Sequence, residues 1–284
     1  MKGPIYLYGN HSSYHSGSKS VWDTLENYIN ELEIEIVDSI DAADTVIVNG
    51  EGSMHHNKFH CSNKIKILNN AYENDKSIFL LNSLWQSNNF KLPLDLREKN
   101  RVVLREVYSR DDLFDNYGLL ASVAPDLVTF SVESKNILES LNSKNQNNQK
   151  LIIGSTDFYL ESMENWVRFS TGKYSDTKYI DIKSLSWSEF LKEVLALDIL
   201  ITGRHHAIYA CLITKTPFIP IKSNSHKIEG LLASSNSKIP CIKDIKELDK
   251  SIEKIISGTF DKDFKRAYEW IRKFTIEDAV PIFN

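Results

Sequence analysis

DILITGRHHAIYACLITKTPFIPIK (residues 198–222) is the stretch that decides the fold. An apolar run (198–203) predicts a buried strand, the small and apolar residues of 205–214 predict a helix, and a second apolar run (217–222) begins with a proline. A helix between two short apolar runs is typical of a parallel sheet with helices on its faces. The polar residues GRHH stand where the first of these strands ends.

The same alternation extends through the rest of the chain. In the first half we expect strands at 5–9, 34–38, 45–50, 77–83 and 101–106 and a last run ending near 130, with helices near 18–32, 62–74 and 110–116. In the second half we expect strands at 151–156 and 178–183 and helices at 160–169, 187–196, 247–257 and 262–274. Ser186 and Glu189 have the spacing of a capping box, which predicts a helix start at 187. The fold class is therefore α/β.

The two alternating series predict two α/β domains. We expect the first over 1–133 and the second over 151–260, because the polar segment between them, 134–150, includes LNSKNQNNQK and cannot fill a core. The C-terminal residues 261–284 carry aromatic side chains at helical spacing, which predicts a helix that crosses back onto the first domain.

Composition excludes several classes of protein. The 284 residues are 42% hydrophobic and 25% charged, and no apolar stretch approaches the roughly 20 residues of a membrane helix. The N-terminal residues lack the features of a signal peptide, so we expect a cytoplasmic protein. A net charge of −4 argues against a nucleic-acid partner. Cys61, Cys211 and Cys241 are widely spaced, which predicts buried thiols and neither disulfides nor a zinc site.

All eight histidines follow predicted strand ends, where open α/β sheets bind ligands. They are His11, His15, His55, His56, His60, His205, His206 and His226. This placement favours a ligand site; one alternative is that the histidines lie there only because surface loops are polar. A metal site built on His55, His56 and His60 is another, but adjacent histidines point in different directions and carboxylates at useful spacing are missing. We therefore expect neither a metal nor a cofactor.

Arg204 is the main candidate for anion binding. It stands at a predicted helix start, where backbone N–H groups and the helix dipole favour an anion and a guanidinium adds a two-pronged contact. Lys227 and Arg110 are further candidate cations; the alternatives are a solvated Lys227 and an ion pair of Arg110 with Asp111 or Asp112. His205 and His206 lie about 100° apart on a helix, and either has the chemistry of an acid or base near neutral pH.

Several motifs resemble those of the polysaccharide pyruvyl transferases. ITGRHHAIYACLITKTPFIPI resembles the T-x-R-x-H helix start of that family, SNSHKIEGLL its lysine-containing segment, SRDD its R-D element, and APDLVTF its P-D-L strand. NGEGSMHH is similar to its glycine-rich loop, whereas GNHSSYHSGSKS departs from its glycine, asparagine and aspartate-rich loop. On this match the R-x-H element falls on Arg204 and His206, and His205 takes the variable position.

The resemblance implies two Rossmann-like domains facing a cleft, as in GT-B proteins, and transfer of a pyruvyl group from phosphoenolpyruvate to sugar hydroxyls. It implies His206 as general acid or phosphate ligand, with His205 as the alternative, and Glu51 as general base, unless Glu51 binds its own loop amides or a sugar hydroxyl. The implied donor-binding residues are Arg204, Arg110, Lys227, His226 and Ser223. The implied acceptor-binding residues are Asn10, His11, His15 and His55, with Trp85 and Tyr14 stacking on the sugar unless Trp85 belongs to the core.

The same resemblance implies an acceptor that is a glycan or a lipid-linked sugar for a bacterial exopolysaccharide or capsule, and peripheral association with the inner face of the membrane. A GT-B glycosyltransferase that uses a nucleotide sugar is the alternative, because the same cations suit a diphosphate. A non-catalytic carbohydrate-binding protein is a third possibility. The presence of arginine, lysine and histidines together disfavours it.

Overall fold

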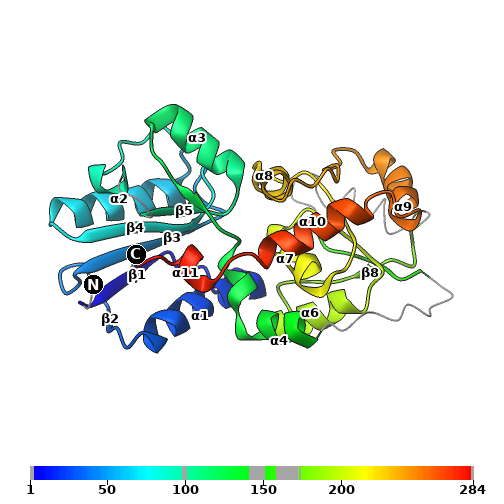
Figure 1. The fold of residues 1–284 in the computed structure, drawn as a ribbon, viewed down its shortest axis with the longest axis horizontal. Coiled ribbons are helices and arrows are strands. Elements are labelled where there is room, and N and C mark those ends of the chain that lie inside the picture. The colour runs from blue at the N-terminus through cyan, green and yellow to red at the C-terminus, as the bar shows by residue number, and fades with distance from the viewer. Residues whose placement is uncertain (1–2, 98–100, 141–150, 158–171, 173, 283–284) are drawn as a thin grey trace. The chain divides into compact units, whose positions relative to one another are not determined.

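The computed structural model describes residues 3–97, 101–140, 151–157, 172 and 174–282. The chain forms two compact units, each built on its own parallel sheet (Figure 1). The first unit comprises 1–11, 21–127 and 274–284, and the second comprises 12–20 and 128–273. The chain therefore enters the second unit briefly after its first strand and returns to the first unit at its C-terminus.

The first unit holds a six-stranded parallel sheet in the order β2-β1-β3-β4-β5-β6. The strands are β1 (Ile5–Tyr8), β2 (Ile36–Val37), β3 (Thr45–Glu51), β4 (Ser77–Ser83), β5 (Val102–Leu104) and β6 (Ser122–Val123). The central pair, β3 and β4, runs in register from Thr45 and Ser77 to Glu51 and Ser83. Both strands are buried almost throughout, which explains their continuous apolar sequences.

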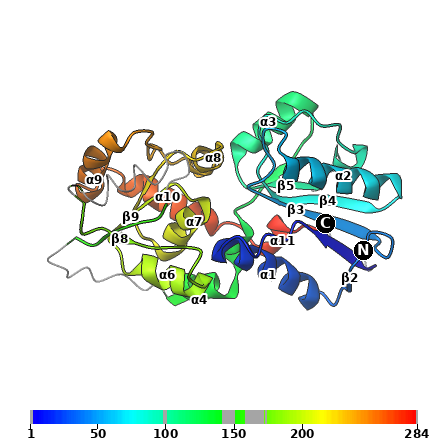
Figure 2. The ribbon, with the colours of Figure 1, turned by 180° about the vertical axis from the view of Figure 1, so that it is seen from behind.

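The helices of the first unit cover both faces of its sheet (Figures 1 and 2). They are α1 (Ser16–Glu31), α2 (Phe59–Glu73), α3 (Val107–Tyr117) and α11 (Ile276–Ala279), with a short 3₁₀ helix at Leu94–Arg97. Helices α2 and α3 lie on one face and α1 on the other, as right-handed crossovers in opposite directions require. The strand order reverses between β1 and β3, so the carboxyl ends of these two strands are the expected ligand site of this unit.

The prediction of a strand that ends near Phe130 is wrong. Strand β6 ends at Val123, and Leu127–Phe130 form a 3₁₀ helix. Pro125 has no N–H for a strand ladder, and the N–H of Leu127 donates to the side chain of Asn82 (3.3 Å). The carboxylate of Asp126 meanwhile accepts from Arg105. Side-chain partners therefore replace strand pairing over this segment.

The second unit holds a four-stranded parallel sheet in the order β10-β9-β7-β8. Its strands are β7 (Ile153–Ser155), β8 (Lys178–Tyr179), β9 (Ile199–Thr202) and β10 (Phe218–Pro220). Its helices are α4 (Val132–Ser140), α6 (Trp187–Leu195), α7 (His205–Thr214), α8 (Lys227–Ser234), α9 (Leu248–Ile256) and α10 (Asp261–Ile271), with a 3₁₀ turn at Ile245–Glu247. The helix expected at 160–169 lies outside the described residues.

Every residue of helix α7 is buried, which agrees with the largely apolar sequence that follows its two histidines. It packs against α4, α6 and α10. The predicted capping box at the start of α6 is confirmed, since Ser186 Oγ accepts from the Glu189 N–H and the Glu189 carboxylate accepts from the Ser186 N–H. Residues 134–140, expected in a linker, belong to α4, where buried Ser134 accepts a hydrogen bond from Trp187 Nε1 (3.0 Å).

The three cysteines are free thiols. Cys61 and Cys211 are buried and Cys241 is half-buried, and burial raises the pKa of Cys61 and of Cys241 to about 12. Within the described ranges, no helix combines the length and the apolar character needed to cross a membrane.

Candidate functional site

The strand order of the second unit reverses between β7 and β9, and polar residues follow both strands at this point. Thr156 and Asp157 come directly after β7, and Arg204 follows β9 two residues after Thr202. The hydroxyls of Thr156 and Thr202 are hydrogen-bonded to each other (2.5 Å), and both residues are fully buried. This contact joins the ends of the two strands and fixes the backbone from which Arg204 extends.

Asp157 and Tyr14 hold Arg204 in place. Its Nε donates to Asp157 Oδ1 (2.9 Å), its Nη2 forms an ion pair with Asp157 Oδ2, and its Nη1 donates to the hydroxyl of Tyr14 (2.9 Å). Burial by itself would lower the pKa of the Arg204 guanidinium. The hydrogen bond to Asp157 and the charge of Asp157 outweigh burial and raise this pKa above its ordinary value, so the side chain is a permanent cation. The sequence did not indicate Asp157, although it directly follows an apolar run.

Two helices of the second unit begin with basic residues at the same edge of the sheet. Arg204 is the N-cap of α7 and His226 that of α8, and neither helix start has a side-chain capping hydrogen bond. Because β9 and β10 are parallel neighbours, both helices start beside the carboxyl ends of these strands. Lys227 opens α8, and its Nζ and the hydroxyl of buried Ser223 both donate to Asn224 Oδ1 (2.9 and 3.3 Å). This edge presents cationic side chains and two positive helix ends.

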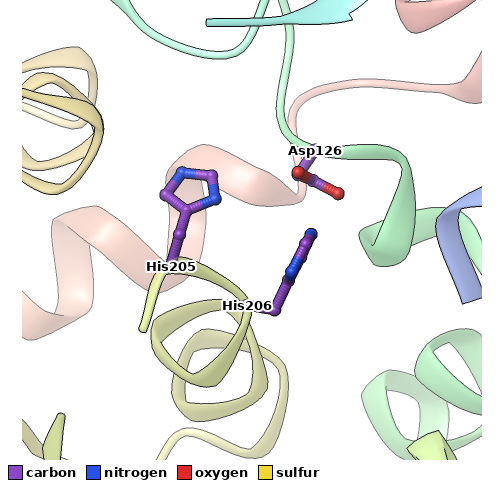
Figure 3. Close-up of side chains that lie close together, drawn as sticks. All are labelled: Asp126, His205 and His206. Carbon is purple, nitrogen blue, oxygen red and sulfur yellow. The ribbon is translucent and has the colours of Figure 1, made fainter. Parts of the chain in front are cut away.

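His205 and His206 occupy the first turn of α7 and are both buried. Figure 3 shows their imidazoles leaving the helix in different directions. The ring of His205 meets Tyr209 edge-on (centroids 5.0 Å apart), and the ring of His206 meets His15 edge-on (4.9 Å). The two rings also meet each other edge-on (centroids 5.9 Å apart), so both belong to one buried cluster although each has a further ring neighbour of its own. Asp126, also drawn in Figure 3, belongs to the first unit, where it accepts from Arg105.

His15 fixes the hydrogen-bonding pattern of His206. The backbone N–H of Ser18 donates to His15 Nδ1 (3.1 Å), so the proton of a neutral His15 is on Nε2. His15 Nε2 faces His206 Nδ1 (3.4 Å), which makes His206 Nδ1 the acceptor and leaves the proton of a neutral His206 on Nε2. His15, expected among the acceptor-binding residues, thus lies beside the candidate acid.

The corresponding strand ends of the first unit surround Lys64, a residue that the sequence did not single out. Lys64 lies on α2 and is only 2% exposed. Its Nζ donates to the carbonyl of Gly50 (2.7 Å) and to Ser53 Oγ (2.9 Å) and contacts His11 Nε2 (2.9 Å). The signal was present in the sequence, because Lys64 falls within the helical stripe formed by Cys61, Ile65 and Leu68.

Glu51, the candidate base, ends β3 beside this lysine and is buried. Its Oε1 accepts from Asn49 Nδ2 (3.3 Å), and its backbone has the left-handed φ of 43°. Burial lowers the pKa of Lys64, and the charge of Glu51 partly opposes this change, so that the pKa of Lys64 falls to about 7.

A cavity of about 370 Å³ opens beside Lys64. It is lined by Leu7, Tyr8, Gly9, Asn10, His11, Trp22, His60, Asn63 and Lys64. Burial, followed by the charge of Lys64, lowers the pKa of His11 to about 3, so its imidazole is neutral near pH 7. Gly9 has a φ of +96°, and a Cβ there would lie 2.3 Å from the carbonyl oxygen of Asn49. The close approach of β1 and β3 at the cavity therefore requires glycine.

Three other expected site residues lie elsewhere in the first unit. Trp85 is fully buried in its core and packs edge-on against Tyr117 (5.6 Å), so the core alternative is correct and stacking on a sugar is not. Arg110 is exposed on α3 and bonds Asp111 through Nε and Nη2 (2.9 and 2.8 Å), which is the ion-pair alternative. His55 is buried, with its Nδ1 2.8 Å from His56 Nδ1.

The chain has two α/β units, each with a parallel sheet and polar side chains at the carboxyl ends of its strands. These features define a GT-B-like fold. In fold, the chain is similar to a UDP-GlcNAc 2-epimerase from Neisseria meningitidis bound to UDP-GlcNAc (TM-score 0.51, 11% identity, 99% of this chain and 98% of that one). It is also similar to a functionally uncharacterised protein from Klebsiella pneumoniae (TM-score 0.51, 10% identity, 86% and 93%). No curated protein matches its sequence.

The sequence model of the polysaccharide pyruvyl transferases matches residues 4–225, and the chain belongs to this family. It is accordingly a transferase with a donor and a glycan acceptor. The matched range includes the cavity beside Lys64, the start of α7 and Ser223, and it ends just before His226 and Lys227.

Proposed function

We propose that this protein transfers a pyruvyl group from phosphoenolpyruvate to two hydroxyls of one sugar in a cell-surface glycan or its lipid-linked precursor. The observation that supports the donor is the pair of basic helix starts at the carboxyl edge of the second unit. Phosphoenolpyruvate carries a phosphate and a carboxylate, and this edge offers two positive helix ends with Arg204 on one and His226 and Lys227 on the other.

Arg204 is the fixed part of this donor site. Its contacts with Asp157 and Tyr14 set the plane of the guanidinium before an anion binds, so little side-chain entropy is lost on binding. Lys227 Nζ donates to the neutral side chain of Asn224, which also accepts from Ser223, so this contact orients the ammonium at the start of α8. We assign the donor anions to Arg204, Lys227, His226 and Ser223.

The chemistry needs a proton donor and a proton acceptor. A proton added to the methylene carbon of phosphoenolpyruvate makes the central carbon electrophilic, and one sugar hydroxyl attacks it as its O–H bond breaks. The bond to phosphate then breaks with its electron pair, and the second hydroxyl closes the ketal and gives its proton to the departing phosphate. We assign the acid to His206, which would act as an imidazolium and give up the proton on Nε2, because its Nδ1 already faces His15.

The first unit supplies the acceptor side of the proposal. Asn10 and His11 line its cavity with hydrogen-bonding groups, and Asn63 and His60 add further ones. The chemistry described needs no metal or organic cofactor, so we expect activity to persist in the presence of a chelator. Acceptors on a lipid carrier at the inner face of the membrane are part of the same proposal.

The test is incubation of the protein with phosphoenolpyruvate and a panel of glycans, read by mass spectrometry for the added pyruvyl mass and by release of inorganic phosphate. We expect both signals together. Thermal stabilisation by a nucleotide sugar and not by phosphoenolpyruvate would instead identify a glycosyltransferase. Stabilisation by neither would favour a carbohydrate-binding protein.

A second measurement tests the acid. His206→Gln keeps a hydrogen-bonding side chain but cannot deliver a proton, so we expect kcat to fall by about 100-fold or more with donor affinity retained. The matched control is His205→Gln at the neighbouring buried position. A normal kcat in the first variant and a loss in the second would move the role to His205.

A further inference from the structure

The cavity of the first unit brings together a histidine and a lysine that are hydrogen-bonded to each other. Both His11 and Lys64 line this cavity, and His11 Nε2 lies 2.9 Å from Lys64 Nζ. We propose that His11 and Lys64 together form the general base of the reaction, with His11 receiving the acceptor hydroxyl proton and Lys64 holding the proton that His11 passes on. This inference rests on the proposed function and gives its acceptor site a chemical role.

The contacts around Lys64 permit two protonation states. As an ammonium, Lys64 has three N–H donors, and Gly50 O, Ser53 Oγ and His11 Nε2 are three acceptors for them. As a neutral amine it has two N–H donors, which suffice for Gly50 and Ser53, and a lone pair that accepts from an Nε2–H of His11. One proton can therefore move along the His11–Lys64 contact without breaking any of the three contacts.

The charges that face Lys64 come from several elements. Burial lowers its pKa most, Glu51 of β3 raises it, Arg105 after β5 lowers it and Cys61 of α2 raises it, which leaves the pKa at about 7. His11 is affected by burial, Lys64, His60 and Arg105, all of which lower its pKa, to about 3. Alone, His11 would be a weak base, but a proton delivered through it comes to rest on the more basic amine.

The proton step balances within this pair. Before transfer, His11 carries its proton on Nε2 and Lys64 is a neutral amine. As the acceptor oxygen bonds to the electrophilic carbon, its proton passes to His11 Nδ1 and the Nε2 proton passes to Lys64, which becomes an ammonium. Glu51 then has a different role from the base expected from the sequence, because its buried carboxylate stabilises the charge that Lys64 acquires.

A purely structural role for Lys64 is the competing explanation, since it also ties α2 to the loop at Gly50 and Ser53. The two roles predict different titrations. The side-chain nitrogens of a protein labelled with ¹⁵N-lysine can be followed by NMR in the intact chain without substrate. We expect Lys64 to titrate near pH 7, and exposed Lys66 on the same helix to serve as the internal reference. A Lys64 that titrates above pH 9 would overturn the proposal.

The kinetic test compares pH profiles of kcat/KM for pyruvylation. The unaltered protein should lose activity below about pH 7 as Lys64 becomes protonated. Lys64→Arg keeps the positive charge but cannot accept a proton. His11→Gln keeps a hydrogen bond to Lys64 but cannot relay a proton to it. We expect each to lower kcat about 100-fold at pH 8 and to abolish the pH dependence near 7, while Lys66→Arg changes neither.

The outcomes separate this inference from the function on which it rests. The unaltered protein could pyruvylate its acceptor while Lys64→Arg and His11→Gln show the same loss of kcat/KM below about pH 7. That result would refute the role of His11 and Lys64 as the base and leave the proposed function intact. An unaltered protein that pyruvylates no acceptor while binding a nucleotide sugar would refute the function, and the base with it. Loss of folding in Lys64→Arg would leave His11→Gln and the NMR titration to decide.

Discussion

The ligand edges of the two units differ in how they hold a cation. In the second unit, Arg204 is bound by the carboxylate of Asp157 and remains charged at every accessible pH. In the first unit, Lys64 contacts a carbonyl, a hydroxyl and an imidazole, and burial lowers its pKa to about 7. Ion pairing to a carboxylate stabilises the charged form, whereas burial among neutral acceptors permits its loss.

The difference agrees with the division of labour that we propose. A donor with two anionic groups needs cations that do not titrate, and arginine beside a carboxylate meets that requirement. An acceptor hydroxyl must lose a proton, and a lysine close to neutrality beside a histidine can take it.

The largest effect is expected at Arg204. Arg204→Ala removes the main donor contact and leaves Asp157 without this partner, so we expect the affinity for phosphoenolpyruvate to fall about 100-fold, close to 2.7 kcal/mol, with the fold retained. Calorimetric titration measures this loss. Lys178→Ala is the control, because it breaks an exposed ion pair with Glu193 in the same unit and should leave donor affinity unchanged. Equal affinities in all three proteins would remove Arg204 from the donor site.

The next effect concerns the position of His206. A Cβ at Gly17 would lie 2.7 Å from both Cβ and Cγ of His206, so Gly17→Ala must displace the imidazole or the start of α1. We expect kcat to fall by about tenfold or more, because small displacements of catalytic groups are costly. Gly118→Ala is the control: it has a φ of +61° and no neighbour within 4 Å, so it should cost about 1 kcal/mol of stability without changing kcat. Similar kcat values in both variants would contradict the proposed role of His206.

The sequence predicted more of the scaffold than of the site. Apolar runs such as those at 45–50 and 77–83 identify buried parallel strands by composition alone, and their order along the chain then places the ligand edges. Asp157 was missed because its importance depends on Arg204, which is distant in sequence and adjacent only in the folded unit. Lys64 was missed because a lysine in a helix usually faces solvent, and only its place in an apolar stripe indicates burial.

A smaller effect is expected in the pH dependence of the free energy of unfolding, which distinguishes a titrating Lys64 from a buried lysine that stays charged. Between pH 7 and 9 the unfolded chain keeps this lysine protonated while the folded chain releases the proton, so the free energy of unfolding rises with pH. We expect the unaltered protein to gain up to about 1.4 kcal/mol per pH unit relative to Lys64→Met, measured by urea unfolding. The difference between the two proteins stops growing where the lysine of the unfolded chain also loses its proton, near its ordinary pKa of 10.5. Parallel stability curves for the two proteins would mean that Lys64 stays charged in the folded state.

The smallest effect is expected at Arg110, the cation that the sequence assigned to the donor from the first domain. Its guanidinium bonds exposed Asp111, and surface ion pairs of this kind contribute little. Arg110→Ala should therefore change the free energy of unfolding by less than about 0.5 kcal/mol and leave the affinity for phosphoenolpyruvate unchanged, as measured by unfolding and by calorimetry. A tenfold loss of donor affinity would show that Arg110 exchanges Asp111 for the donor, because the pair is exposed and holds the side chain only weakly.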